Sequence, residues 1–323
     1  MLKWLVVGIG DITKKRVLPA LFDEPRSQVV GIVTRDPAKA EPYAVPSWQS
    51  LELALRESDA TAVYVATPVF LHMPQTIAAL QAGRNVLCEK PVAMNYREAC
   101  LMQEAAARTG RKLGIAYYRR MYPKVKRAKE LMDAGVIGQP FMGEAVVHDW
   151  PRMDNAADDW RISPEMAGGG PLYDIGSHRI DLMNFLFGTP VRASGHISTL
   201  VRKIAVEDNA TVLIDYQNGA RGLVDVRWHS RITRDEFRVR GTEGEINLTP
   251  LNDPLLVSPA GVEQIPAPAN LHYPCIADFV SAVLDDAPMG SSGATALLTD
   301  WVTEQVMQNS FLASEQSLPR STH

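Results

Sequence analysis

The chain has 323 residues, of which 46% are hydrophobic and 22% charged, and its formal net charge is −4. These values are typical of a globular protein with one large or two ordinary domains, and they give no electrostatic reason to expect nucleic acid or an anionic membrane as a partner. The three cysteines form neither a paired framework nor a metal-binding spacing, and no apolar run could span a bilayer, so we expect a cytoplasmic protein without a metal site.

The first third of the chain alternates apolar runs with helical patterns. The expected strands are 2–7, 28–33, 61–66, 85–89 and 112–116, and the expected helices are 11–22, 50–56, 68–82 and 96–108. This alternation with short links predicts a parallel sheet covered on both faces, which is an α/β Rossmann dinucleotide-binding domain over residues 1–118. Ligands of such sheets bind at the carboxyl ends of the strands, where the chemically unusual stretches of this third also lie.

The first strand and helix are joined by the sequence GIGDIT, which begins at Gly8. Glycines here permit a tight turn and the approach of a pyrophosphate to the helix N-terminus. Gly8, Gly10, Asp11 and Ile12 are therefore candidate cofactor-binding residues. Thr13 stands where the motif has Gly or Ala, and it could push the helix and strand slightly apart. The alternative is an ordinary strand–helix turn without a ligand.

The end of the second strand bears on which nicotinamide cofactor is bound. Thr34 can hydrogen-bond a 2′-phosphate, and Arg35 can pair with it and stack on the adenine end. An acidic residue at that point would repel the phosphate, whereas Asp36 is expected to cap the turn with Pro37. We therefore favour NADP(H) and keep NAD(H) open. The alternative is that Arg35 is a solvated surface residue.

Lys90 ends the apolar strand 85–89 within the tripeptide Glu89-Lys90-Pro91. An ammonium group at this end lies near the nicotinamide, where it can stabilise negative charge that develops on a substrate oxygen during hydride transfer. Thr67, at the end of the preceding strand, is a further candidate for cofactor binding. The alternative is a lysine that reaches solvent and pairs with Glu89.

After Tyr118 the pattern changes to a mixed α+β domain, expected over residues 119–323. A helix is expected at 124–134, and extended segments joined by turn pairs such as Asn218-Gly219 favour antiparallel hairpins. These segments are 141–147, 191–200, 210–216, 221–228, 236–240 and 245–248. Helices are expected at 277–284 and 294–312, and we expect the last to pack back on the first domain.

The sequence AGGGPLYDIGSHRID, from Ala167, predicts a helix that carries titratable groups on one side. Asp174 and His178 are four residues apart and Asp181 continues the same face. Histidine suits proton exchange near neutral pH, and a neighbouring carboxylate would orient it and raise its pKa. The three glycines permit backbone angles that other residues avoid. The alternative is a surface Asp–His pair.

In combination these motifs resemble the Gfo/Idh/MocA family (glucose–fructose oxidoreductase, inositol dehydrogenase and rhizopine catabolism) over nearly the whole chain. The resemblance rests on the Gly8 start, the runs 72–95 and 119–140, and the glycine-led segment 168–182. It implies that Lys90, Asp174 and His178 form the catalytic set. It also implies oxidation or reduction of a sugar or cyclitol hydroxyl/carbonyl pair with NAD(H) or NADP(H).

The resemblance adds further candidate residues and a quaternary structure. His72, Glu89, Lys90, Trp160 and Arg161 fall in segments expected near the cofactor, and Tyr118 and Arg119 join the three catalytic residues in substrate binding. Tyr118 stands where many relatives have Asn or His, so the substrate pocket is expected to differ. The second domain is expected to be a large, mostly antiparallel open sheet that packs subunits into a homodimer or homotetramer.

The leading hypothesis is an NAD(P)-dependent dehydrogenase or reductase that acts on a CH–OH group of a small, sugar-like molecule. A non-catalytic NAD(P)-binding sensor or scaffold on the same fold is the alternative, because fold does not fix function. A dihydrodiol-type dehydrogenase would have an aromatic-rich pocket, for which the candidates are Tyr117, Tyr118, Trp150, Trp160 and Tyr173. Arg119, Arg152 and Arg161 could serve an acidic sugar, although surface pairing is favoured for at least two of them.

Overall fold

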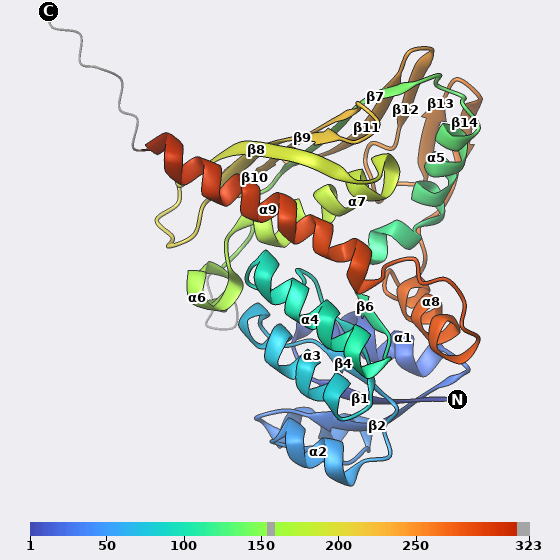
Figure 1. Cartoon of the computed structure of the whole chain (residues 1–323), viewed down its shortest axis with the longest axis vertical. Coiled ribbons are helices and arrows are strands. Elements are labelled where there is room, and N and C mark those ends of the chain that lie inside the picture. The colour runs from blue at the N-terminus through green and yellow to red at the C-terminus, as the bar shows by residue number, and fades with distance from the viewer. Residues whose placement is uncertain (154–158, 315–323) are drawn as a thin grey trace, which may run out of the picture.

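A computed structural model of the chain describes residues 1–153 and 159–314 (Figure 1). Within these ranges the first sheet has six parallel strands in the order β3-β2-β1-β4-β5-β6. The strands are β1 (Leu2–Val7), β2 (Ser27–Val33), β3 (Ser47–Trp48), β4 (Ala62–Val65), β5 (Asn85–Cys88) and β6 (Leu113–Ile115). This order reverses direction at β1, which confirms the predicted Rossmann fold and directs the ends of β1, β4 and β5 toward one crevice.

Local signals in the sequence explain where the helices around this sheet begin. Ser50 accepts a hydrogen bond from the N–H of Leu53 and caps α2, and Asn95 caps α4 through the N–H of Glu98. The helices are α1 (Leu18–Asp23), α2 (Leu51–Glu57), α3 (His72–Gln81) and α4 (Tyr96–Thr109). A wider helical turn at Thr13–Val17 precedes α1. The edge strand β3 was not expected, because two residues cannot show an apolar pattern.

The second sheet has eight described strands in the order β14-β13-β12-β11-β7-β10-β9-β8. Only β7 and β10 run parallel, so the sheet is mostly antiparallel, as expected. The strands are β7 (Pro140–His148), β8 (Pro190–Ser198), β9 (Asn209–Tyr216), β10 (Arg221–Arg227), β11 (Arg234–Gly241), β12 (Gly244–Asn247), β13 (Leu255–Ser258) and β14 (Gly261–Gln264). The sequence did not predict β13 and β14, which have four residues each and mostly exposed or half-buried side chains.

Helices cover the inner face of the second sheet and join it to the first. Helix α7 packs so closely on β7 that a Cβ at Gly143 would lie 2.5 Å from the sulfur of Met183. The helices of this part are α5 (Pro123–Asp133), α6 (Pro164–Ala167), α7 (Ser177–Phe187), α8 (Tyr273–Leu284) and α9 (Gly293–Ser314). Helix α9 runs diagonally between the two sheets and contacts β8, α7 and α4 (Figure 1).

One hydrophobic core spans both sheets. The ring of Trp4 in β1 lies 5.4 Å from the ring of Phe279 in α8, and the same buried cluster continues through Tyr122 to Phe237 on the second sheet. The crevice at the ends of β1, β4 and β5 therefore lies against α7 and the segment after β6. Among the described residues, no helix has both the length and the apolar character that a membrane span requires.

Candidate active site

The glycine turn after β1 is shaped by the neighbouring strand. Gly8 has φ +94°, and a Cβ there would lie 2.6 Å from the carbonyl oxygen of Ala66, so no larger residue fits. A Cβ at Gly10 would meet nothing within 4 Å. Thr13 is buried, and its hydroxyl donates to the carbonyl of Gly8 at 3.1 Å, so the larger third residue is held by a hydrogen bond.

Gly10 leaves the start of the first helix open, which is where a dinucleotide pyrophosphate is expected to bind. A side chain at Gly10 would occupy space that the protein leaves free at the start of a helix, where unpaired N–H groups attract anions. Ile12 lies in the same helical turn. The exposed Asp11 pairs with Lys15 at 2.7 Å, and this ammonium holds the pKa of Asp11 below its ordinary value. The loop therefore has the shape that the cofactor prediction requires.

The end of β2 carries the residues expected to select the cofactor. The carboxylate of Asp36 accepts from the N–H of Ala38 at 3.2 Å and caps the turn that starts at Pro37, which confirms that prediction. The Thr34 hydroxyl turns toward the backbone of Asp36. Arg35 is exposed. The edge thus presents one cation and no acidic side chain at the end of β2 itself.

Two side chains from distant parts of the chain meet beyond the end of β5: Lys90 follows this strand, and Asp174 lies in the helical turn Leu172–Gly176 before α7. The Lys90 ammonium donates to the carboxylate of Asp174 at 2.7 Å and to its backbone carbonyl at 2.9 Å. Burial opposes ionisation of Asp174, but the charge of Lys90 outweighs it and lowers the pKa of Asp174. Lys90 does not pair with Glu89, which was the alternative. The side chain of Lys90 is 15% exposed and that of Asp174 49%, so a ligand can reach this pair.

His178 lies one turn beyond Asp174 but has a different environment from the expected one. Its ring packs edge-on against Tyr118 at 4.9 Å and against Tyr117 at 5.9 Å. Burial, together with the positive charges of Lys90 and Arg119, lowers the pKa of His178 well below its ordinary value. The expected rise in the pKa of His178 is therefore wrong, because the carboxylate of Asp174 contacts Lys90 and not the imidazole.

The third titratable residue of the helix has a structural contact. Asp181 is 1% exposed and accepts from Nε of Arg120 at 2.7 Å as part of a two-point ion pair. Nη1 of Arg120 also donates to the hydroxyl of Thr295 in α9. The expected row of carboxylate, imidazole and carboxylate is therefore incomplete, because Asp181 joins α7 to the segment after β6.

Two predicted cofactor residues, His72 and Glu89, are buried beneath the loops after β4 and β5. His72 is 1% exposed, and its two ring nitrogens lie 2.9 Å from the carbonyl oxygens of Pro91 and Thr67. Glu89 is also buried, and it accepts from the hydroxyl of Tyr64 at 2.8 Å. Any effect of His72 or Glu89 on a cofactor would therefore act through the loops after β4 and β5.

Trp160 and Arg161 lie beside the same crevice, in a turn at Asp159–Ile162. The guanidinium of Arg161 lies 5.5 Å from the centre of the Trp160 ring. Arg161 adds to the Lys15 effect on the pKa of Asp11 and to the Lys90 effect on that of Asp174. Its charge therefore lies between the glycine loop and the Lys90–Asp174 pair.

The three glycines before the helix that carries Asp174 and His178 leave space for two neighbouring groups. A Cβ at Gly169 would overlap the ring of Tyr173, and one at Gly170 would overlap the carbonyl oxygen of Glu207. The buried carboxylate of Glu207 accepts from the N–H of Gly170 at 2.8 Å and from that of Leu172 at 3.1 Å. Glu207 therefore fixes the start of the helix that carries Asp174 and His178, a role no sequence motif indicated.

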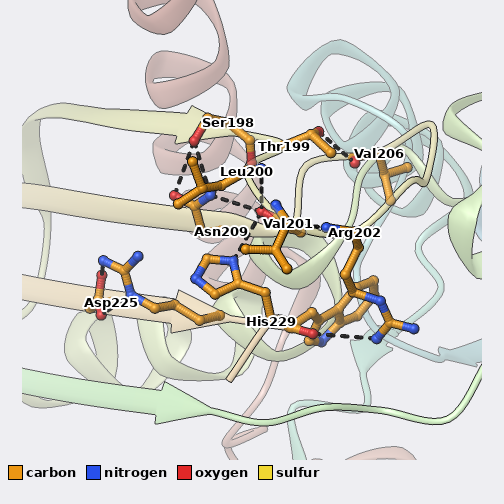
Figure 2. A network of polar contacts seen from close by, with 12 residues as sticks. Ser198, Thr199, Leu200, Val201, Arg202, Val206, Asn209, Asp225 and His229 are labelled. Carbon is orange, nitrogen blue, oxygen red and sulfur yellow. Dashed lines mark hydrogen bonds and ion pairs between the residues drawn. The ribbon is translucent and has the colours of Figure 1, made fainter. Parts of the chain in front are cut away.

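The loop that presents Glu207 is anchored by its neighbour Asp208, which contacts the segment of Leu200, Val201 and Arg202 labelled in Figure 2. The buried carboxylate of Asp208 accepts from the N–H groups of Leu200, Val201 and Arg202 at 2.7–2.9 Å. His229 lies 3.1 Å from it. Burial opposes ionisation, but these donors hold the pKa of Asp208 far below its ordinary value. The position of Glu207 is therefore set by a rigid loop.

Replacing Glu207 with glutamine is expected to disturb the catalytic helix. An amide can accept one of the two N–H bonds but turns its own NH2 toward the other, which leaves a buried donor unpaired. We expect the free energy of unfolding to fall by about 1–3 kcal/mol and kcat to fall, with cofactor affinity unchanged. Urea unfolding and turnover measure both effects. Glu165→Gln, at an exposed carboxylate on α6, is the control, and equal changes in the two variants would contradict the assignment.

Both parts of the chain match known protein families. Residues 2–117 match a family described as "Oxidoreductase family, NAD-binding Rossmann fold", and residues 125–247 match the "GFO/IDH/MocA C-terminal domain". The chain is similar to a 1,5-anhydro-D-fructose reductase of Ensifer adhaerens, with 29% identity over 88% of each chain. It is also similar to a D-xylose 1-dehydrogenase [NADP(+)] of Haloarcula marismortui, with 28% identity over 77% of this chain and 72% of that one.

The fold is also similar to that of a solved structure. An oxidoreductase from Thermotoga maritima superimposes with a TM-score of 0.87 at 24% identity, and the match covers 96% of each chain. At this identity the likeness concerns the fold. The two domains and the position of the second sheet therefore recur together in another protein.

Proposed function

Because this chain belongs to the Gfo/Idh/MocA family of NAD(P)-dependent oxidoreductases, we propose that it transfers hydride between NADP(H) and a hydroxyl/carbonyl pair of a sugar-like substrate. The observation that carries the proposal is the contact of 2.7 Å between Lys90 of the first domain and Asp174 of the second, with His178 one turn away. When bound, the nicotinamide supplies or accepts the hydride.

In this proposal Lys90 binds the reacting oxygen of the substrate. Its ammonium is oriented by two oxygens of Asp174, and a substrate oxygen can take a place beside them because the pair is open to solvent. In the reduction direction, negative charge grows on the carbonyl oxygen as hydride arrives at the carbon, and in the oxidation direction it grows on the hydroxyl oxygen as the proton leaves; a fixed cation at that point lowers the barrier in both directions. Asp174 holds Lys90 and does not exchange the proton.

His178 then exchanges the proton of the reacting hydroxyl. Its lowered pKa keeps the imidazole neutral at neutral pH, so it can accept this proton during oxidation and return it during reduction. Nδ1 of His178 is enclosed and has no hydrogen-bond partner among the described residues. Nε2 is therefore assigned to the substrate side. Tyr118, packed on the ring, excludes water from one flank.

The preference for NADP(H) is supported by the edge of β2. Arg35 is exposed there, Thr34 is beside it, and Asp36 is engaged in capping the next turn. A cation whose neighbouring carboxylate already accepts a hydrogen bond from a backbone N–H suits a 2′-phosphate. The D-xylose dehydrogenase noted above is named for NADP(+), which agrees with this choice. The homodimer or homotetramer and the cytoplasmic location stay predictions.

A screen with both cofactors tests the proposed function. Purified protein is incubated with NADP+ or NAD+ and a panel of aldoses, inositols, keto-sugars and a trans-dihydrodiol, and nicotinamide absorbance is followed. We expect turnover with at least one sugar-like compound and a higher kcat/KM with NADP+. Saturable cofactor binding without hydride transfer to any compound would instead favour the sensor or scaffold, and turnover of the dihydrodiol alone would favour the third hypothesis.

The cofactor arm of the screen uses the Arg35→Ser variant. Loss of a charge-assisted bond to the 2′-phosphate is expected to raise KM for NADP+ by about 10-fold or more and to leave KM for NAD+ unchanged. Arg56→Ser, at an exposed position on α2, is the matched control. Equal KM changes for both cofactors would contradict the assigned role of Arg35.

A further inference from the structure

The residue after Tyr118 is a buried guanidinium that lacks a counter-ion. Arg119 is 7% exposed, its Nη1 donates to the amide oxygen of Asn252 at 2.8 Å, and its enclosed Nε has no hydrogen-bond partner among the described residues. The described residues place no carboxylate within ion-pair distance of it. Buried charges in proteins are normally paired, because an isolated charge loses its hydration without compensation.

The surroundings of Arg119 are strongly positive. Arg179, which follows His178, is 1% exposed, and its Nε and Nη1 also have no partner among the described residues. Burial and then the nearby charge of Arg119 lower the pKa of Arg179 to about 10. Asp235 neutralises Arg179 and Asp174 neutralises Lys90, so Arg119 remains as the surplus cation beside His178.

The position of Arg119 is fixed by its neighbours. Its guanidinium lies 5.6 Å from the centre of the Tyr118 ring and 5.8 Å from that of Tyr122. Its partner Asn252 belongs to a loop that Lys124 anchors, since the Lys124 ammonium donates to four carbonyl oxygens between residues 248 and 255 at 2.5–3.2 Å. These contacts therefore fix the position of the Arg119 guanidinium before any ligand binds.

We propose that Arg119 binds an anionic group of the substrate, so that the enzyme acts on a sugar acid or a sugar phosphate rather than a neutral sugar. The inference rests on the proposed function, because it places the anion on the molecule whose reacting oxygen meets Lys90. A carboxylate or phosphate would supply the missing counter-charge, and the planar guanidinium suits both. Nη2, the nitrogen that is neither enclosed nor bonded in the described structure, would make the contact.

Stacking alone does not account for the buried cation. Cation–π contacts stabilise a cation less than the loss of its hydration on burial destabilises it. The nearby charge of Arg179 raises the positive potential around Arg119 further, which an anionic substituent would offset. If Arg119 were only structural, replacing it would weaken charged and neutral substrates equally. If it binds an anionic group, the replacement weakens the anionic substrate more.

Matched substrate pairs test the proposal. Gluconate is compared with glucitol, glucuronate with glucose, and glucose 6-phosphate with glucose, on the NADP+-loaded protein, by hydride transfer and by calorimetric binding. We expect a preference of about 10- to 100-fold for the anionic member of at least one pair. Arg119→Gln should abolish that preference by lowering kcat/KM for the anionic member far more than for the neutral member, and Arg119→Lys should restore part of it. Which pair responds distinguishes carboxylate from phosphate.

The controls separate the two proposals. Arg108→Gln, at an exposed position on α4, should keep the wild-type preference, and thermal unfolding reports whether each variant folds. Equal or better use of the neutral members by the wild type, or equal losses for both members in Arg119→Gln, would overturn the anion proposal. A binding preference without hydride transfer would leave it standing and refute the proposed function.

Discussion

Replacing Lys90 with methionine is expected to lower kcat by about 100- to 1,000-fold, because the variant keeps most of the side-chain volume but loses the only ammonium placed at the reacting oxygen by the described residues. Lys90 reaches Asp174 across the two domains at 2.7 Å, so its loss removes both the charge and the link between them. Cofactor reduction measured under saturating substrate reports the change. Binding of NADP+, measured separately, should change much less than kcat.

The control for this variant is Lys129→Met. Lys129 forms a surface ion pair with Asp133 on α5 and contacts none of the proposed site residues, so the substitution removes an equal charge outside the site. We expect its kcat to equal that of the wild type. Undiminished turnover by the Lys90 variant on the true substrate would exclude the role assigned to this ammonium.

The second large effect is expected for His178→Asn. Loss of the proton acceptor should lower kcat/KM for oxidation by about 100- to 10,000-fold. In the wild type the pKa of His178 lies well below 6.5, so the neutral, competent form persists on the acidic side of neutrality. The acid limb of the kcat/KM profile should therefore fall below pH 6.5 and should be absent from the variant.

The same pKa direction has a consequence for stability. A histidine whose pKa is lowered by folding takes up a proton more readily when unfolded, so the stability it contributes is lost as pH falls below its ordinary value of 6.5. Denaturant unfolding between pH 5 and 7 measures this slope. His196→Asn, on the exposed side of β8, is the control for the stability measurement.

For the pH dependence of kcat/KM, an acid limb above pH 6.5, or one that persists in His178→Asn, would assign the proton transfer to another group.

Much of the first domain could be predicted because its signals are local. Each long apolar run became a strand, and the polar residues Ser50 and Asn95 mark helix starts that depend only on nearby backbone. The resemblance also placed Lys90, Asp174 and His178 in one set, through two motifs that are specific in combination, but it did not predict the direct contact of Lys90 with Asp174. The short strands β3, β13 and β14 were missed, since their place depends on the strands beside them and not on their own pattern.

The electrostatics of the site could not be predicted, because they depend on contacts between distant segments. Helical spacing put Asp174 next to His178, but the carboxylate turned to a lysine 84 residues away. The same limit applies to Arg120 with Asp181 and to Glu207 with Gly170, which are separated by 61 and 37 residues. Spacing along a helix identifies which groups share a face, and the pKa of each is then decided by what the fold brings against it.

The contacts of α9 have a consequence for the order in which the protein folds during synthesis. Asp300 accepts from the N–H of Ala93, just after Lys90, and Thr299 of the same helix accepts from the amide of Asn184 in α7. The ribosome synthesises α9 after both segments that it contacts. A nascent chain that has reached residue 290 therefore already contains Lys90 and the whole of α7, but it lacks the helix that contacts both segments. We expect the two halves of the site to keep a fixed relative position only after α9 has packed against them.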